Sequence, residues 1–132
     1  MKLMITGSRK ATGPEHKAAL KAAIEKHGKG ATLILHGGAK GADTLAEELA
    51  QEMGLPTEVI KPDYQNHHYK AAPLKRNTLL VAKADKVIAY YIGTKRGGTL
   101  DAATKAADQD KLQAEYLNGK ELTTPPKQLQ LL

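Results

Sequence analysis

Three glycine-rich turns, each following an apolar segment, constrain the fold of this chain more than any other feature of its sequence. They are Gly7-Ser8-Arg9 and the segments 36–43 and 96–101. Residues with the apolar spacing of a helix come after each turn, so the order strand, turn, helix repeats along the chain. This alternation predicts an α/β fold whose parallel strands are joined by right-handed crossovers.

The predicted elements form a Rossmann-like three-layer sandwich with a mostly parallel sheet of four to five strands flanked by helices. We expect strands at 2–6, 31–35, 57–60 and 86–91, and a fifth at 111–117 that returns as an antiparallel segment at 120–123 after Asn118-Gly119. The helices begin at Pro14, near Ala42, at Pro73 and at Thr99. The first helix is expected to bury Ala18, Ala19, Ala22, Ala23 and Ile24. The third is expected to carry Leu74 as a further apolar residue and to bury Leu79, Leu80 and Val81. We therefore expect one Rossmann-like domain at 1–110, and a strand or hairpin followed by a loose tail at 111–132.

Composition excludes several classes of function. The chain has no cysteine, so disulfides, thiolate catalysis and cysteine zinc sites are ruled out. No apolar run approaches the roughly 20 residues of a membrane span, and no signal peptide is evident, so we expect a cytoplasmic protein without a membrane partner. The net charge of +6 favours an anionic partner, although the lysines are scattered and form no nucleic-acid-binding arm.

The first glycine turn contains the candidate ligand-binding residues Gly7, Ser8 and Arg9. In open α/β sheets, ligands bind at the carboxyl ends of the strands, where this turn lies. The hydroxyl and backbone of Ser8 can donate to a phosphate, and the Arg9 guanidinium offers a fork of donors to anionic oxygens. The alternative is a simple turn with a surface arginine.

The second turn supplies five further candidates: His36, Gly37, Gly38, Gly41 and Asp43. Its glycines let the backbone approach a ligand, and the helix that starts near Ala42 adds unpaired N–H groups and a positive dipole end. Asp43 can instead cap that helix. A histidine at the end of a strand is as often structural as ligand-binding.

The third turn offers Gly97, Gly98 and Thr99 as a phosphate-binding turn, and Thr99 can alternatively cap the following helix. Asp101 lies in the first turn of that helix, where a negative charge is favourable in any case. Arg76 and Asn77 are polar residues in an otherwise apolar helical segment, and a solvated helix face explains them equally well. We predict no metal site, because the adjacent His67 and His68 cannot share a helix face, and no cofactor.

The four motifs together resemble the YspA-like branch of the SLOG superfamily, which also contains DNA-processing protein A and the Lonely Guy phosphoribohydrolases. They are Met4-Ile5-Thr6-Gly7-Ser8-Arg9, the segment 35–43, Pro73-Leu74-Lys75-Arg76-Asn77, and Gly97-Gly98-Thr99-Leu100-Asp101. The resemblance implies a pocket for nucleotides or ADP-ribose-like ligands, with Arg76 and Asn77 facing it. Relatives often pair through helices beside the pocket, so a homodimer or higher homo-oligomer is consistent with it.

Three functions follow from this reading. The first is binding of a nucleotide or nucleotide derivative such as AMP or ADP-ribose. The second is hydrolysis of the N-glycosidic bond of nucleotide 5′-monophosphates, with Arg76 and Asp101 as the catalytic residues. Lonely Guy enzymes carry a glutamate where this chain has Ala102, and Asp101 is one residue away, about 100° around the helix. The third is single-stranded DNA binding, with Tyr64, Tyr69, Tyr90 and Tyr91 as stacking candidates.

Overall fold

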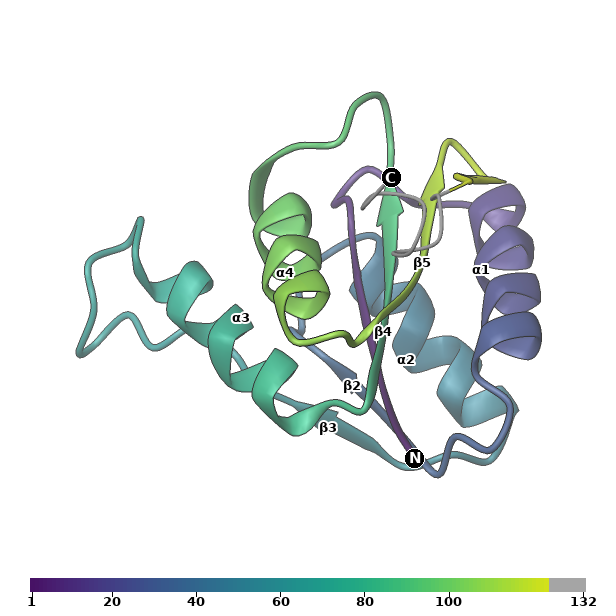
Figure 1. Cartoon of the computed structure of the whole chain (residues 1–132), viewed down its shortest axis with the longest axis horizontal. Helices are drawn as coiled ribbons and strands as arrows, with labels where there is room; N and C mark the ends of the chain where they lie inside the picture. Colours follow the sequence, from purple (N-terminus) through teal and green to yellow (C-terminus); the bar gives the residue numbers. More distant parts are fainter. Residues whose placement is uncertain (124–132) are drawn as a thin grey trace, which may run out of the picture.

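The protein is a layered α/β domain with one central sheet, as the alternation of elements predicts (Figure 1). The structure, a computed structural model, describes residues 1–123, so the predicted tail at 124–132 lies outside the described residues. The strands are β1 (Lys2–Gly7), β2 (Leu33–His36), β3 (Thr57–Val59), β4 (Lys86–Tyr91), β5 (Leu112–Leu117) and β6 (Lys120–Glu121). The helices are α1 (Pro14–His27), α2 (Ala42–Glu52), α3 (Ala72–Lys83) and α4 (Gly97–Asp108).

The sheet order is β3-β2-β1-β4-β5-β6, and β1 to β5 are parallel. Successive strands are added outward on one side of β1 and then on the other, so the order reverses between β1 and β4. Met4 of β1 pairs with Leu35 on one side and with Val87 on the other. The Rossmann-like sandwich is thus confirmed, and the antiparallel return expected after Asn118-Gly119 is present as β6, in which Lys120 pairs with Leu117.

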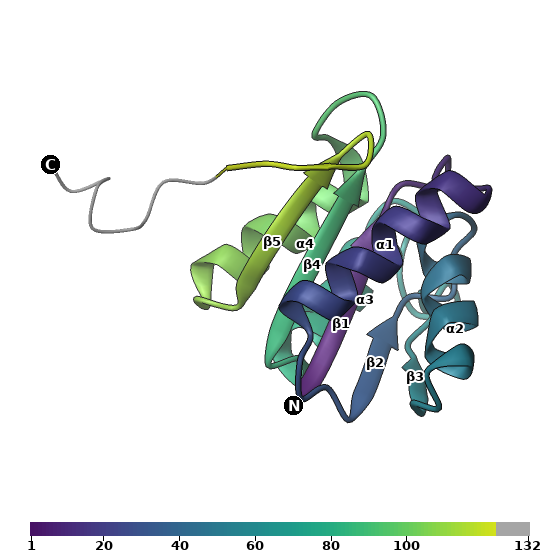
Figure 2. The same cartoon turned by 90° about the vertical axis from the view of Figure 1, so that its right-hand side faces the viewer.

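The helices cover both faces of the sheet in pairs: α1 and α2 on one face, α3 and α4 on the other (Figure 2). Alternating residues of β1 serve the two layers, since Leu3 and Ile5 pack beneath α1 and α2, and Met4 packs beneath α3 and α4. The chain has no Phe or Trp, so the core is mainly aliphatic.

Two predicted helix faces differ from the structure. Ala18 and Ala22 of α1 are exposed, and Leu20 is buried with Ala23 and Ile24 instead. Alanine occurs all around this helix, so its pattern does not mark one apolar face.

In α3, Leu74 and Leu79 are 42% and 57% exposed. This helix turns Asn77, Leu80 and Val81 toward the sheet, a spacing of three and four residues that places one polar side chain in the core. Exposure of two leucines is the consequence, because both lie off that face.

The segment that follows α4 continues the main sheet. In β5, Tyr116 pairs with Tyr90 of β4, and the Tyr116 hydroxyl lies 3.1 Å from His27 Nε2 on α1. The domain boundary after residue 110 stays a prediction. Within residues 1–123, no helix has both the length and the apolar character that crossing a membrane requires.

Candidate functional site

A cavity of about 570 Å³ opens where β1 and β4 end, at the point where the strand order reverses. Pockets of this size accept small-molecule ligands, and this edge is where open α/β sheets bind them. The three glycine turns, predicted to meet here, all contribute to the wall. Ten of the predicted ligand-binding residues line it: Gly7, Ser8, Arg9, Gly37, Asp43, Arg76, Asn77, Gly97, Gly98 and Thr99.

All three arginines of the chain line this one cavity. Lys10 and Lys70 line it too, whereas Asp43 is the one carboxylate in the wall among the described residues. The Arg9 and Arg96 side chains are exposed. Neither forms an ion pair or hydrogen bond with the part of the chain that the structure describes, so both have their donors available to an anion.

The first turn is fixed to the sheet and to the second turn by its backbone. The Ser8 N–H donates to the carbonyl of Tyr90 (2.8 Å), and the Ser8 carbonyl accepts from Ala42 (3.1 Å). The predicted phosphate contact through the Ser8 amide is therefore wrong for this arrangement, because the amide already has a strand partner. The hydroxyl accepts from the Lys10 N–H (3.1 Å), which leaves its proton free to donate to a ligand.

Asp43 braces the second turn and does not cap α2. Its Oδ2 accepts from the N–H groups of Gly37 (3.2 Å) and Ala39 (3.1 Å), and α2 has no side-chain cap. Burial raises the pKa of the Asp43 carboxyl, while the Ala39 N–H and the Arg76 charge oppose the shift. With this carboxylate in its first turn and the Ala42 N–H bonded to Ser8, α2 offers a poor site for an anion.

Three other residues predicted for the second turn lie outside the cavity wall. His36 is buried, with Nε2 2.7 Å from Glu47 and Nδ1 accepting from the Gly38 N–H, so both ring nitrogens have protein partners. Gly38 packs against Val59, and Gly41 packs against the backbone of Ser8 and Arg9. These three residues therefore support the conformation of the turn through contacts outside the cavity wall.

Arg76 and Asn77 connect the turns to one another. Arg76 donates to the carbonyl of Gly37 (2.7 Å) and to Asn77 Oδ1 (3.0 Å), and Asn77 Nδ2 donates to the carbonyl of Gly98 (3.0 Å). Asn77 is only 4% exposed, so the alternative of a solvated helix face is wrong for it. α3 therefore holds the second and third turns in register across the cavity.

The N-terminus of α4 is the best anion site in the wall. The N–H groups of Gly97, Gly98 and Thr99 have no acceptor among the described residues, and no side chain caps the helix. Thr99 is buried to 9% exposure and lines the cavity, and its hydroxyl has no protein partner in residues 1–123. Unpaired amides at the positive end of a helix dipole are suited to phosphate.

The predicted catalytic carboxylate, Asp101, is not part of the cavity wall. Its Oδ2 accepts from Asn77 Nδ2 (3.2 Å) and from Lys105 Nζ (2.9 Å), one turn along the same helix. Asp101 precedes Ala102 by one residue, which is a rotation of about 100° around the helix. This offset places the Asp101 side chain in the interface between α3 and α4. Its contacts are those of a residue that positions Asn77.

Sequence reasoning missed a buried group beside the third turn. Glu115 of β5 accepts from the Tyr91 hydroxyl (2.8 Å) and from Lys95 Nζ (3.0 Å), and it is only 6% exposed. Burial, together with this hydrogen bond, raises the pKa of Tyr91. A glutamate amid the apolar residues of a strand was the available signal.

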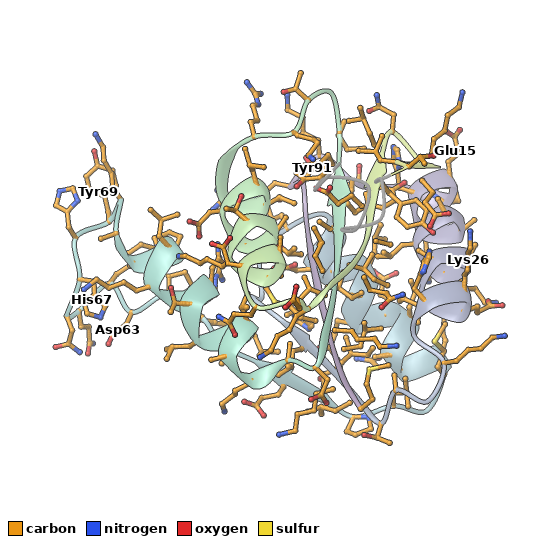
Figure 3. All side chains as sticks on the ribbon, in the orientation of Figure 1. Glu15, Lys26, Asp63, His67, Tyr69 and Tyr91 are labelled. Atoms are coloured by element: carbon orange, nitrogen blue, oxygen red, sulfur yellow. The ribbon has the colours of Figure 1, made fainter. Side chains whose placement is uncertain are left out.

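The tyrosines divide into two kinds. Tyr90 and Tyr91 are at most 1% exposed, so their prediction as base-stacking residues is wrong. Tyr69 is 65% exposed and lines the cavity, and Tyr64 is 56% exposed but does not. Figure 3 shows Tyr69 on the protruding loop before α3, with Asp63 and His67, while Tyr91 lies in the body of the domain.

The fold and the site together define a Rossmann-like domain with a strongly cationic cavity at its topological switch point. The model of the YspA, cpYpsA-related SLOG family matches residues 1–67, just over half of the chain, and the chain belongs to that family. The resemblance seen in the sequence is thereby confirmed.

A solved structure of DNA processing protein A from Helicobacter pylori, described for its mode of binding single-stranded DNA, is similar to this chain. The TM-score is 0.59, with 22% sequence identity over 96% of this chain and 67% of that one. At this identity the likeness shows the shared fold. A comparison with curated proteins gave no significant match.

Proposed function

We propose that this SLOG domain binds a nucleotide or a nucleotide derivative, of the AMP or ADP-ribose type, in the cavity at the ends of β1, β2 and β4. The observation that carries the proposal is the gathering of every arginine of the chain around one cavity. Arginine presents a planar fork that matches phosphate oxygens, and it is over-represented where phosphate is recognised. The remaining 17 basic residues are lysines, and of those within residues 1–123 only two line the wall.

The phosphate is expected at the N-terminus of α4. There the amides of Gly98 and Thr99 and the Thr99 hydroxyl are unpaired, and Arg9 and Arg96 approach from the first and third turns. Arg76 is half-buried and bonded to the backbone, so we assign it the positioning of the second turn rather than catalysis. This division leaves two free guanidinium groups for the ligand.

Isothermal calorimetry with AMP and ADP-ribose tests the proposal. Arg9→Gln and Arg96→Gln each remove a charge-assisted hydrogen bond of about 1.5–3 kcal/mol, so we expect affinity to fall by roughly 10- to 100-fold. Lys21→Gln, at an exposed position on α1, is the matched control and leaves affinity unchanged. Absence of binding across both ligands, or equal affinities in all four proteins, refutes the proposal.

The hydrolase alternative requires a carboxylate near the sugar. Asp43 is bonded to two turn amides and Asp101 lies outside the wall, so the described residues place no free carboxylate there. We therefore expect release of free base from AMP or CMP to be no faster with this protein than with Asp101→Asn. Faster release by the unmodified protein would restore the enzymatic reading.

Single-stranded DNA is the second candidate ligand, because two exposed tyrosines, Tyr64 and Tyr69, lie on the loop before α3, and Tyr69 lines the cavity next to Lys70. The similar DNA processing protein A is described as binding single-stranded DNA. Fluorescence anisotropy of a labelled oligo-dT checks this candidate. Binding that weakens steeply with salt favours it, and binding displaced by AMP would place both ligands in one site.

A further inference from the structure

The wall of the cavity is chemically divided. Among the described residues, five large hydrophobic side chains are exposed, and two of them, Tyr69 (65%) and Leu74 (42%), line this cavity. Pro73 lies beside them, in the first turn of α3. The unpaired amides and Arg96 belong to the α4 side. A ligand that fills both parts needs an anionic end and a flat apolar end.

We propose that Tyr69, Pro73 and Leu74 hold the base of the nucleotide by stacking and apolar contact alone, so that the site accepts nucleoside phosphates with little regard to the base. This inference rests on the proposed function, because it assigns the second end of the same ligand. It specifies the ligand class as nucleoside phosphates rather than sugar phosphates or inorganic phosphate.

The two ends come from different loops that flank the opening. The loop between β3 and α3 extends away from the body and carries Tyr69, and the loop between β4 and α4 rises on the other side (Figures 1 and 3). Residues of both loops, Tyr69 and Lys70 on one and Thr94 and Arg96 on the other, line the same cavity. A ligand that fills this cavity therefore contacts both loops.

The ring of Tyr69 is available for stacking. His68 packs against it at 4.5 Å between ring centroids and 37° between planes, which restrains the tyrosine. The Lys70 amine lies 5.8 Å from the ring centroid and is exposed. Because this lysine is exposed, it can move aside for a base that stacks on the ring. Stacking on an aromatic ring is tolerant of sequence because every base has a π-face.

The amide and carboxylate acceptors of the wall are already engaged, and the free guanidinium groups are assigned to the phosphate. Fixed acceptors are the groups that would recognise the exocyclic amino groups of adenine, guanine and cytosine. Asn77 donates to Gly98 and Asp101 and accepts from Arg76, and Asp43 accepts from two turn amides. The other side-chain acceptors lining the described wall are hydroxyls, which rotate to donate or accept and so select weakly. The expected result is affinity without base specificity.

Calorimetry with AMP, GMP, CMP and ribose 5-phosphate tests this inference. We expect the three nucleotides to bind within about threefold of one another, and ribose 5-phosphate to bind about tenfold more weakly, since one stacked base is lost. Tyr69→Ala lowers AMP affinity toward that of ribose 5-phosphate, because most of the stacking is lost, and leaves the affinity for ribose 5-phosphate itself unaffected. Tyr64→Ala is the matched control, because Tyr64 is exposed on the same loop but does not line the cavity.

The outcomes separate this inference from the proposed function. If ribose 5-phosphate binds as tightly as AMP and Tyr69→Ala has no effect, the base subsite is refuted and phosphate binding stands. A preference of more than about tenfold for one base refutes the lack of specificity. If none of the four compounds binds, the proposed function itself fails, and binding of oligo-dT alone would assign the cavity to nucleic acid.

Discussion

At the scale of single residues, Arg76 and Arg96 are the same type of residue in different surroundings. Arg76 is half-buried and donates to the carbonyl of Gly37 and to Asn77, whereas Arg96 is exposed and has no protein partner among the described residues. Burial lowers the pKa of Arg76, and the neighbouring Asp43 opposes the shift. The first arginine therefore acts on the structure of the wall and the second on the ligand.

Arg76→Ala is expected to lower the free energy of unfolding by about 1.5–3 kcal/mol, because it removes hydrogen bonds from a charged group and leaves the Gly37 carbonyl unpaired. Arg96→Ala is expected to change it by less than about 0.5 kcal/mol. Urea denaturation of the two variants measures the difference. Equal losses in both would contradict the separation of their roles.

Gly41 is required where the first two turns meet. A side chain there would collide with the backbone of Ser8 and Arg9, and the residue has φ +78°. Gly54 has a similar φ of +71° with open space around it, so Gly54→Ala isolates the cost of the backbone conformation, about 1–2 kcal/mol. Gly41→Ala should be less stable than Gly54→Ala by a further ~1–3 kcal/mol. Thermal unfolding of both variants checks this, and equal stability would show that the turns can separate at no cost.

At the scale of elements, β5 holds the loop that leads into α4. Lys95 contacts both carboxylate oxygens of buried Glu115, and the Tyr91 hydroxyl donates to Oε2 of the same carboxylate. The Gly93 N–H donates to Asn118 Oδ1 (2.8 Å). These contacts fix both ends of the loop just before the unpaired amides of α4. The C-terminal segment therefore positions a turn to which it is not adjacent in sequence.

Glu115→Gln is expected to loosen this loop and weaken AMP binding, because the amide retains a partner for Tyr91 but loses the charge that attracts Lys95. Faster hydrogen exchange at the Gly93 and Leu100 amides, which are hydrogen-bonded at the two ends of the loop, and a stability loss of about 1.5–3 kcal/mol are the expected signals. Glu58→Gln is the control, since Glu58 pairs with Lys83 on the surface and exposed pairs contribute about 0–1 kcal/mol. Unchanged exchange in Glu115→Gln would contradict the anchoring role.

A pH-dependent contact joins α2 to the end of β2. His36 lowers the pKa of Glu47 below its usual 4.5, with smaller effects from Gln51 and Thr57. A carboxylate with a depressed pKa stabilises the folded state above pH 4.5, and its contribution is lost as the pH falls through the lowered value. Glu47→Gln should therefore be less stable than the unmodified protein at neutral pH, with the difference shrinking below pH 4.5 in urea titrations. Glu25→Gln, at an exposed site, is the matched control for removal of one carboxylate.

The elements could be predicted where local signals and global packing agree. Apolar runs followed by glycine located β1, β2 and β4, and the rule that parallel strands end at one edge placed the three turns together. The inner face of α1 could not be predicted, because alanine is compatible with either side. The partners of Ser8 and Asp43 could not be predicted either, since they depend on how closely two turns pack. The use of a residue in a site is decided by such non-local hydrogen bonds.

At the scale of the whole molecule, the distribution of charge links ligand binding to stability. Among residues 1–123, five cationic side chains and one carboxylate line the cavity. The cationic side chains repel one another in the folded protein, and a bound anion relieves that repulsion. AMP at about 100 times its Kd should stabilise the fold by about 2.7 kcal/mol, which raises the Tm of a chain of this length by roughly 8–10 °C. Raising the salt from about 0.1 M to about 1 M should reduce this rise at a fixed AMP concentration, because screening weakens the attraction. The double variant Arg9→Gln, Arg96→Gln should show a smaller rise and a weaker salt dependence than Lys21→Gln. If the rise in Tm changes neither with the salt concentration nor with substitution of these arginines, AMP binds elsewhere on the protein.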